Sequence, residues 1–146
     1  MKQYTWNLIV RDADDFNPSF TTPSDVTRWL QTRPEFKQPR EAVMVLMVDT
    51  RNRLRSFEHI SSGTLNGSLV HPCDVYRAAL HEPNCAAVIL VHSHPSGNPR
   101  PSREDLELTR RLREAGHILG VDMLDHIIIT PVGNTYSLKT HNLLDP

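Results

Sequence analysis

The sequence predicts an α/β sandwich, and two observations support this fold class. Residues 42–48 and 86–91 form continuous apolar runs that include β-branched side chains, which is typical of strands buried on both faces. Helical patterns over residues 72–81 and from residue 102 to about residue 120 alternate with these runs. From residue 41 onward, the predicted order of elements is therefore β-β-α-β-α-β-β.

The size and composition of the chain are those of a single globular domain. The chain has 146 residues, of which 38% are hydrophobic and 23% are charged, as in ordinary soluble proteins. A chain of this length can bury a core without disulfides. The formal net charge of −1 gives no overall attraction to nucleic acid, although a local basic patch remains an option.

The cysteines and the apolar segments bear on where the protein works. Cys73 and Cys85 are too few for a disulfide framework and form no C-x-x-C pair, so we interpret both as buried or partly buried thiols. No apolar segment approaches the length of a membrane span, and the first residues contain no signal-peptide core. We therefore expect a cytoplasmic protein that has no membrane partner.

Residues 1–40 have a weaker core pattern than the rest of the chain and are punctuated by four prolines. They contain a short predicted strand at residues 4–10 and a short predicted helix at residues 26–31. We expect an N-terminal extension that packs on the main domain or on a second copy of it, which would make a homodimer. The main domain is expected at residues 41–146.

The elements of the main domain follow from local signals. The strand at residues 42–48 turns through residues 49–53 into a return strand at residues 54–60, and a loop at residues 61–67 follows. Pro72 suits the first position of a helix that ends near residue 81. A strand at residues 121–129, a turn at residues 131–134 and a last strand at residues 135–138 complete the chain. The inner side of the helix at residues 72–81 is predicted to comprise Val75, Ala78, Ala79 and Leu80.

The most informative stretch joins the apolar run at residues 86–91 to the long helix. His92 and His94 stand two residues apart at the end of a predicted strand, so both rings leave the same face. Asp105 falls in the first turn of the following helix, which can fold back over that strand end. Two histidines and one carboxylate, with a fourth position open, form a ligand set that catalytic zinc uses.

Ser102 and Asp105 also form an S-x-x-D pattern close to the capping box, which by itself would explain both residues. The box does not explain the two histidines upstream, nor the direction in which Asp105 points. The apolar stripe of this helix places Asp105 on the inner side, where a carboxylate needs a cation or hydrogen-bond donors. The residues of that stripe are Leu108, Leu112, Ala115 and Leu119.

A zinc hydrolase also needs a proton carrier and an oxyanion donor. Glu41 precedes the most apolar strand, where a carboxylate partly withdrawn from water would suit proton transfer. The alternative is a solvated strand-end charge beside Arg40. The hydroxyl of Ser102 lies in sequence between the histidine pair and Asp105, which makes it the natural oxyanion donor.

These residues carry a resemblance to a known family. Glu41, the run His92-Ser93-His94, Ser102 and Asp105 resemble the JAMM motif of MPN-type metalloproteases, and the surrounding runs are similar to the RadC-like branch over about residues 41–138. The resemblance implies a three-layer α/β/α sandwich with a mixed sheet and a cytidine-deaminase-like JAB/MPN core. It also implies one zinc ion bound by His92, His94 and Asp105, with Glu41 as acid–base and Ser102 as oxyanion stabiliser.

Asp125 and His126 also recur in that branch. The pair is interpreted either as a buried histidine held for structural reasons or as an outer pair that orients the zinc ligands. Direct ligation by His126 is the remaining alternative.

The sequence departs from the branch at three points. Ser93 stands where the branch usually has Asn, and Cys73 stands where it usually has Arg. The helix-hairpin-helix region typical of RadC-like proteins has no counterpart in the first forty residues. The last departure weakens an expectation of DNA repair.

The leading hypothesis is a zinc-dependent metallopeptidase or isopeptidase that acts on a peptide or protein, with a ubiquitin-like conjugate as one option. A nucleobase deaminase would need H-x-E and P-C-x-x-C, whereas position 94 is His and no C-x-x-C occurs. The alternative from another class is a non-enzymatic RadC-like module for DNA repair or recombination. Its modest basic patch, interleaved with glutamates, would comprise Arg100, Arg103, Arg110, Arg111 and Arg113.

Overall fold

The computed structural model describes residues 18–62 and 70–145 of the chain. The predicted strand at residues 4–10 and most of the predicted loop at residues 61–67 lie outside this part. Among the described residues, five strands form one sheet in the order β2-β1-β3-β4-β5. The strands are β1 (Ala42–Val48), β2 (Leu54–Ser62), β3 (Ala87–Ser93), β4 (Asp122–Ile129) and β5 (Thr135–Ser137).

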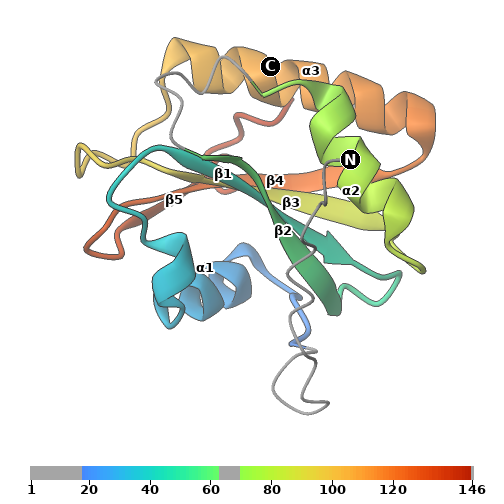
Figure 1. Cartoon of the computed structure of the whole chain (residues 1–146), viewed down its shortest axis with the longest axis horizontal. Coiled ribbons are helices and arrows are strands. Elements are labelled where there is room, and N and C mark those ends of the chain that lie inside the picture. The colour runs from blue at the N-terminus through green and yellow to red at the C-terminus, as the bar shows by residue number, and fades with distance from the viewer. Residues whose placement is uncertain (1–17, 63–69, 146) are drawn as a thin grey trace, which may run out of the picture.

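Helices cover both faces of this sheet (Figure 1). Helices α2 (Pro72–His81) and α3 (Arg103–Leu119) lie on one face, whereas α1 (Pro23–Gln31) and the short 3-10 helix η1 (Pro34–Phe36) lie on the other. The arrangement confirms the predicted α/β/α sandwich and the predicted order of elements. The layer opposite α2 and α3 comes from the segment that we assigned to an extension, and the domain boundary at residue 40 stays a prediction.

The sheet is mixed, as expected. Strand β1 pairs antiparallel with β2 and β3, β3 runs parallel to β4, and β4 pairs antiparallel with β5. Every residue of β1 and β3 is buried because helices cover both of their faces.

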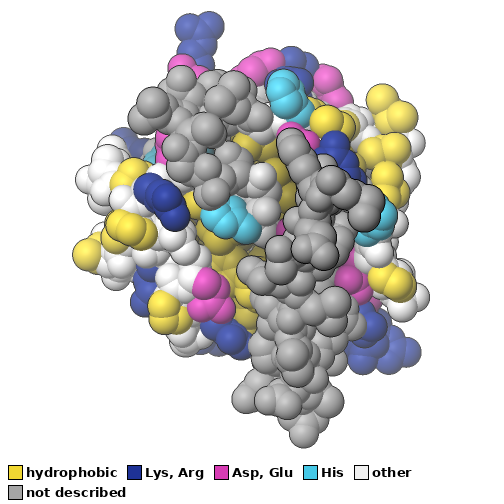
Figure 2. Space-filling view, in the orientation of Figure 1, with side chains coloured by type: hydrophobic (Ala, Val, Ile, Leu, Met, Phe, Trp, Pro, Cys, Tyr) yellow, Lys and Arg dark blue, Asp and Glu magenta, His cyan; other side chains and the backbone are white. Residues whose placement is uncertain are grey.

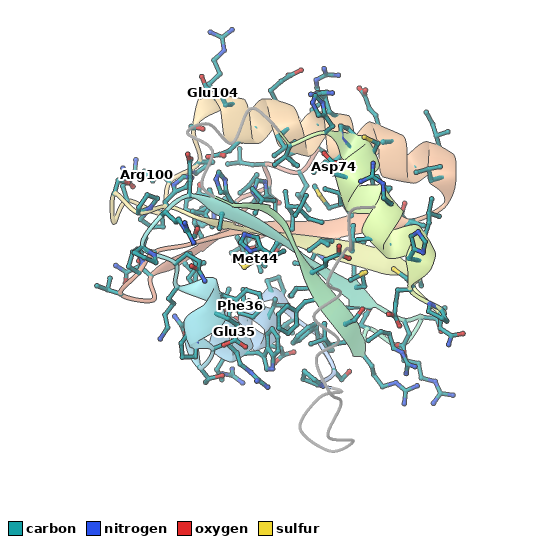
Figure 3. All side chains as sticks on the ribbon, viewed as in Figure 1. Glu35, Phe36, Met44, Asp74, Arg100 and Glu104 are labelled. Atoms are coloured by element: carbon teal, nitrogen blue, oxygen red, sulfur yellow. The ribbon has the colours of Figure 1, made fainter. Side chains whose placement is uncertain are left out.

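Alternate residues of β1 enter two separate cores. Val43 and Val45 belong to the core beneath α2 and α3. Met44 and Leu46 belong to the core on the α1 side, where Phe36 is fully buried. Figure 3 shows Met44 and Phe36 in this second layer, between the sheet and α1.

Two of the helices start at capping boxes. In α1, the Thr22 hydroxyl accepts a hydrogen bond from the Asp25 amide, and the Asp25 carboxylate accepts one from the Thr22 amide. This box starts α1 at Pro23, three residues before the predicted start. Ser102 and Asp105 cap α3 in the same way, and Gly120 ends that helix in the left-handed conformation with φ of 75°.

The inner stripes of α2 and α3 are shorter than predicted. Leu108 and Leu112 are buried as expected, but Leu119 and Leu80 are 47% and 63% exposed. Both exposed leucines stand in the last turn of their helices. One turn earlier, Tyr76 and Gly116 are buried and hold the inner positions.

Two further expectations concern the cysteines and the membrane. Cys85 is half-buried as expected, whereas Cys73 is exposed because it lies on the outer side of the first turn of α2, so its prediction as a buried thiol was wrong. None of the helices in residues 18–62 and 70–145 is long and apolar enough to span a membrane.

Gly116 of α3 lies against Tyr76 of α2, and this contact yields a prediction about stability. The Tyr76 hydroxyl donates a 2.7 Å hydrogen bond to the Leu112 carbonyl, and a Cβ at position 116 would collide with that hydroxyl and with the Val121 carbonyl. We expect Gly116→Ala to lower the free energy of unfolding by about 1–3 kcal/mol, measured by urea denaturation. The control, His117→Ala at the exposed neighbour, should change it by less than about 0.5 kcal/mol. Equal stability of Gly116→Ala and wild type would contradict this packing.

Candidate metal centre

The residues singled out in the sequence come together where β1 begins and β3 ends. Because these strands are antiparallel, Val43 faces His92 and Ala42 faces Ser93 in the register. Glu41 immediately precedes β1, so it lies beside the histidine pair. The first turn of α3 brings Asp105 to the same place, where it is 3% exposed. The four predicted residues Glu41, His92, His94 and Asp105 therefore form one cluster.

Asp105 lies between the two imidazole rings. Its Oδ1 is 2.8 Å from His92 Nδ1, and its Oδ2 is 3.1 Å from His94 Nε2. The second nitrogen of His92, Nε2, is 3.4 Å from Oε1 of Glu41. The two rings stand edge to face with centroids 4.8 Å apart.

The close contacts of His92 lack the alignment of hydrogen bonds. Both of its ring nitrogens are buried and have no hydrogen-bond partner of acceptable geometry, although oxygens lie 2.8 and 3.4 Å away. The His92 nitrogens and the carboxylate oxygens are close, but their N–H and lone-pair directions are not aligned with one another. Ligands of a metal ion have this arrangement, because each of them points at the ion. A cation bound on either side of the ring would satisfy one of the two unpartnered nitrogens of His92.

The ring of His94 is oriented by the loop that follows it. Its Nδ1 is 3.0 Å from the Asn98 carbonyl, which can only accept, so Nδ1 carries the hydrogen. In the neutral ring, Nε2 then has a free lone pair that faces Asp105. The turn is closed by Gly97, whose φ of 84° suits glycine, and whose amide donates to the His94 carbonyl. Metal-binding histidines typically donate their other nitrogen in this way.

The ligand atoms of the cluster are close enough together to hold a metal ion. Two ligand atoms bound at about 2.0–2.1 Å in tetrahedral geometry stand about 3.3 Å apart. His92 Nδ1 and His94 Nε2 lie 2.8 and 3.1 Å from Asp105, and His92 Nε2 lies 3.4 Å from Glu41, so a given ion would use only one of the two His92 nitrogens. Two ligand sets are compatible with the geometry. One is the predicted set of His92, His94 and Asp105, and the other is Glu41, His92 and His94, whose ligand atoms all lie within 4.8 Å of one another. In the second set, Asp105 would orient the rings.

The electrostatics of the cluster are dominated by Asp105. Burial opposes its charge, but the adjacent imidazoles of His92 and His94 outweigh that effect and hold the pKa of Asp105 far below its usual range. Burial also opposes the charge of His94, yet the neighbouring Asp105 raises the pKa of His94 overall. The carboxylate is thus ionised and is attractive to a cation.

Ser102 is joined to the cluster through the capping box. Its hydroxyl accepts a 3.1 Å hydrogen bond from the Asp105 amide, while its own amide donates to Asp105 Oδ2 over 2.8 Å. The cap uses the hydroxyl oxygen as an acceptor and leaves its hydrogen available. The structural and the chemical interpretation of Ser102 are therefore compatible.

His126 supports the cluster from the core. Its ring is fully buried and stacks at 6.1 Å from the ring of His92. Thr109 donates a hydrogen bond to the Asp105 carbonyl and lies 2.7 Å from His126 Nδ1, so Nδ1 is the donor in this second contact. His126 therefore reaches Asp105 through Thr109, and its buried Nε2 has no partner among the described residues.

Asp125 does not contact the ring of His126. Its carboxylate accepts hydrogen bonds from the Ser137 hydroxyl and from the amides of His126 and Lys139. These contacts tie the end of β5 to β4, and burial raises the pKa of Asp125 despite them. Thr109 and the Asn98 carbonyl are the supporting groups that the sequence analysis missed. The position of Thr109, four residues after Asp105 on the helix, could have suggested its role, whereas a backbone carbonyl leaves no signal.

The burial of His126 leads to a prediction about pH. Burial lowers its pKa to about 3, below the ordinary value of about 6.5 in an unfolded chain. Its contribution to stability is therefore complete above pH ~6.5 and is lost as the pH falls toward ~3. We expect the metal-free wild type to lose about 2–3 kcal/mol more than His126→Gln between pH 7.5 and 4.5, measured by urea unfolding with chelator. Identical losses in both proteins would contradict the neutral buried state.

Comparison with known proteins shows the family of the chain. The model of the RadC-like JAB domain family matches residues 20–143. A UPF0758 protein from Caldanaerobacter subterraneus subsp. tengcongensis is 46% identical over 129 residues, which cover 88% of this chain and 54% of that protein. A UPF0758 protein from Methanosarcina acetivorans is 47% identical over 118 residues, which cover 81% of this chain and 50% of that protein. The chain thus spans about half the length of these curated relatives, and it belongs to the RadC-like JAB domain family.

Proposed function

We propose that this chain is a zinc-dependent hydrolase that cleaves peptide or isopeptide bonds. The observation that carries the proposal is the convergence of His92, His94 and Asp105, without hydrogen-bond alignment at His92, beside the carboxylate of Glu41. Family membership is consistent with the proposal, because JAB domains include hydrolases. The names of the relatives specify no activity.

The donor set favours zinc over hard cations. Imidazole nitrogen is a good ligand for Zn²⁺, whereas Ca²⁺ and Mg²⁺ prefer sites made of oxygen atoms. His92, His94 and Asp105 would hold the ion and leave one position for substrate or water. When bound, zinc supplies polarisation of the attacked carbonyl and a lower pKa for the attacking water.

Glu41 is proposed to carry the proton. Its side chain is 35% exposed, so it can meet a substrate, and its Oε1 lies beside His92. In hydrolysis, this carboxylate would accept a proton from the attacking water and deliver it to the departing nitrogen. Glu41 contacts only one histidine, whereas Asp105 contacts both, which favours Asp105 as the ligand and Glu41 as the proton carrier.

Ser102 is proposed to stabilise the oxyanion that forms on the attacked carbonyl. Its hydroxyl hydrogen is available because the cap uses only the oxygen. The hydrogen bond that it accepts from the Asp105 amide fixes the hydroxyl relative to the cluster, which is the preorganisation that such a donor needs.

The DNA-binding alternative has less support. Arg110 contacts both Glu107 and Glu114 at 2.6 Å, and Arg113 pairs with Asp145. Two of the five arginines of the predicted patch are thus matched by carboxylates. Figure 2 shows cationic and anionic side chains intermingled on the face displayed. Arg100 and Glu104, both labelled in Figure 3, are exposed side chains of opposite charge.

The substrate and the location are also part of the proposal. A peptide or a protein conjugate, including a ubiquitin-like one, is the proposed substrate class, and a homodimer is the proposed assembly. Because the chain spans about half of its relatives, the activity of the longer proteins is likewise a proposal. The free state of Cys73 and Cys85 is consistent with the expected cytoplasmic location.

The first prediction from this proposal concerns metal content. Purified protein should contain about one zinc per chain by elemental analysis, and His94→Ala should lose it because one of three ligands is removed. His117→Ala, an exposed histidine on α3, is the matched control and should keep the metal. The metallohydrolase proposal would be refuted if the wild type took up no zinc and if chelator did not change its stability.

The second prediction concerns Glu41. Glu41→Gln should keep zinc and lower hydrolysis of a peptide and ubiquitin-like fusion panel by about 10²–10⁴-fold, because proton transfer is lost. Glu35→Gln, the same change in η1, should leave the rate unchanged. Loss of zinc from Glu41→Gln would instead assign Glu41 to the ligand set, and an unchanged rate would remove it from the mechanism.

A further inference from the structure

We propose that Ser93 is a positioning residue that sets Glu41 beside the histidine pair by holding the main chain on both sides of it. The inference rests on the proposed role of Glu41 in hydrolysis. It assigns a task to the one residue between His92 and His94, whose side chain belongs to neither ligand set.

The contacts of Ser93 bracket Glu41. Ser93 is the last residue of β3 and is 0% exposed. Its hydroxyl accepts a 2.9 Å hydrogen bond from the Ala42 amide and donates to the Arg40 carbonyl over 2.8 Å. The Ala42 carbonyl, at 3.4 Å, is a second and more distant acceptor. One hydroxyl thus binds the peptide groups before and after Glu41.

Glu41 has few other constraints. In the described part of the chain, the ladders from β1 to β2 and to β3 both begin at Ala42, so Glu41 stands just outside the paired sheet. Its carboxylate is 35% exposed and makes its closest recorded contact, 3.4 Å, with His92. A residue at the open end of a strand would be free to fray, and the Ser93 hydroxyl is the group that opposes this.

Because side chains alternate along a strand, the side chains of Glu41 and Ser93 lie on opposite faces of the sheet. His92 lies opposite Val43, whose side chain enters the core beneath α2 and α3. Glu41, two residues before Val43, follows the same face. Ser93 lies opposite Ala42, whose side chain enters the other core. Ser93 therefore reaches Glu41 only through the backbone and does not touch the reacting groups.

The test compares Ser93→Ala with Ser93→Asn, which can both donate and accept. Ser93→Ala is expected to lower kcat by about 10- to 100-fold, because displacement of a catalytic group by about 1 Å has effects of this size. KM and zinc content should not change, and Ser93→Asn should recover part of kcat. In the Glu41→Gln background, Ser93→Ala should cause no further loss. Ser56→Ala is the matched control. It removes the hydrogen bond between a β2 serine and Glu82 and should leave kcat unchanged.

Two readouts need no activity. Amide hydrogen exchange at Ala42 should accelerate about tenfold or more in Ser93→Ala while exchange in the middle of β1 is unchanged. In a crystal structure of metal-free Ser93→Ala, the Glu41 carboxylate should have moved away from its position 3.4 Å from His92 Nε2. If Ser93→Ala is too unstable for kinetics, amide exchange at Ala42 and the position of Glu41 can be measured on Ser93→Asn instead.

The possible failures are distinguishable. An equal loss of kcat in the wild-type and Glu41→Gln backgrounds, or an unmoved Glu41 in Ser93→Ala, would overturn the positioning role and leave the proposed function intact. If zinc-loaded wild type cleaves nothing in the panel, the proposed function has failed. The displacement of Glu41 and the exchange at Ala42 then decide the inference about Ser93 by themselves.

Discussion

The site depends on one buried carboxylate. Asp105 is 3% exposed, and an ionised group in that position must be matched by donors or cations. The chain supplies two imidazoles, and it supplies the amide of Ser102 through the capping box. Asp105 therefore has two roles at once, since it starts α3 and holds the cluster. Its geometry as a cap fixes its geometry toward the histidines.

The fold brings the other members of the cluster to this carboxylate through ordinary sheet rules. Antiparallel pairing sets the start of β1 beside the end of β3. His92 in β3 and His94, which directly follows β3, are two residues apart, so both rings reach Asp105 at the start of α3. Thr109 and His126 then connect the helix to β4 behind the site. The cluster is held by strand, helix and core together, which is the support that preorganised sites require.

Much of this could be predicted because the signals are local. The apolar runs gave β1 and β3, and the spacing of the histidines and the S-x-x-D pattern gave the start of α3 and the cluster. The groups that the sequence did not reveal act through the backbone or over long distances. The Asn98 carbonyl has no side-chain signature, and the role of α1 as a covering layer depends on contacts with β1 rather than on its own short pattern. The ends of α2 and α3 were predicted correctly, but periodicity alone did not show that Leu80 and Leu119, in the last turns of these helices, are exposed.

The alternation of His92, Ser93 and His94 at the end of β3 has a consequence for how the chain folds. A slip of β3 by one residue against its neighbours would exchange the faces, so that both imidazoles would enter the apolar layer beneath α1 and the hydroxyl would enter the other. Such a misregistered chain could not gather the cluster at all. If a metal ion binds the cluster, it would bind only correctly paired molecules and would stabilise them relative to misregistered ones.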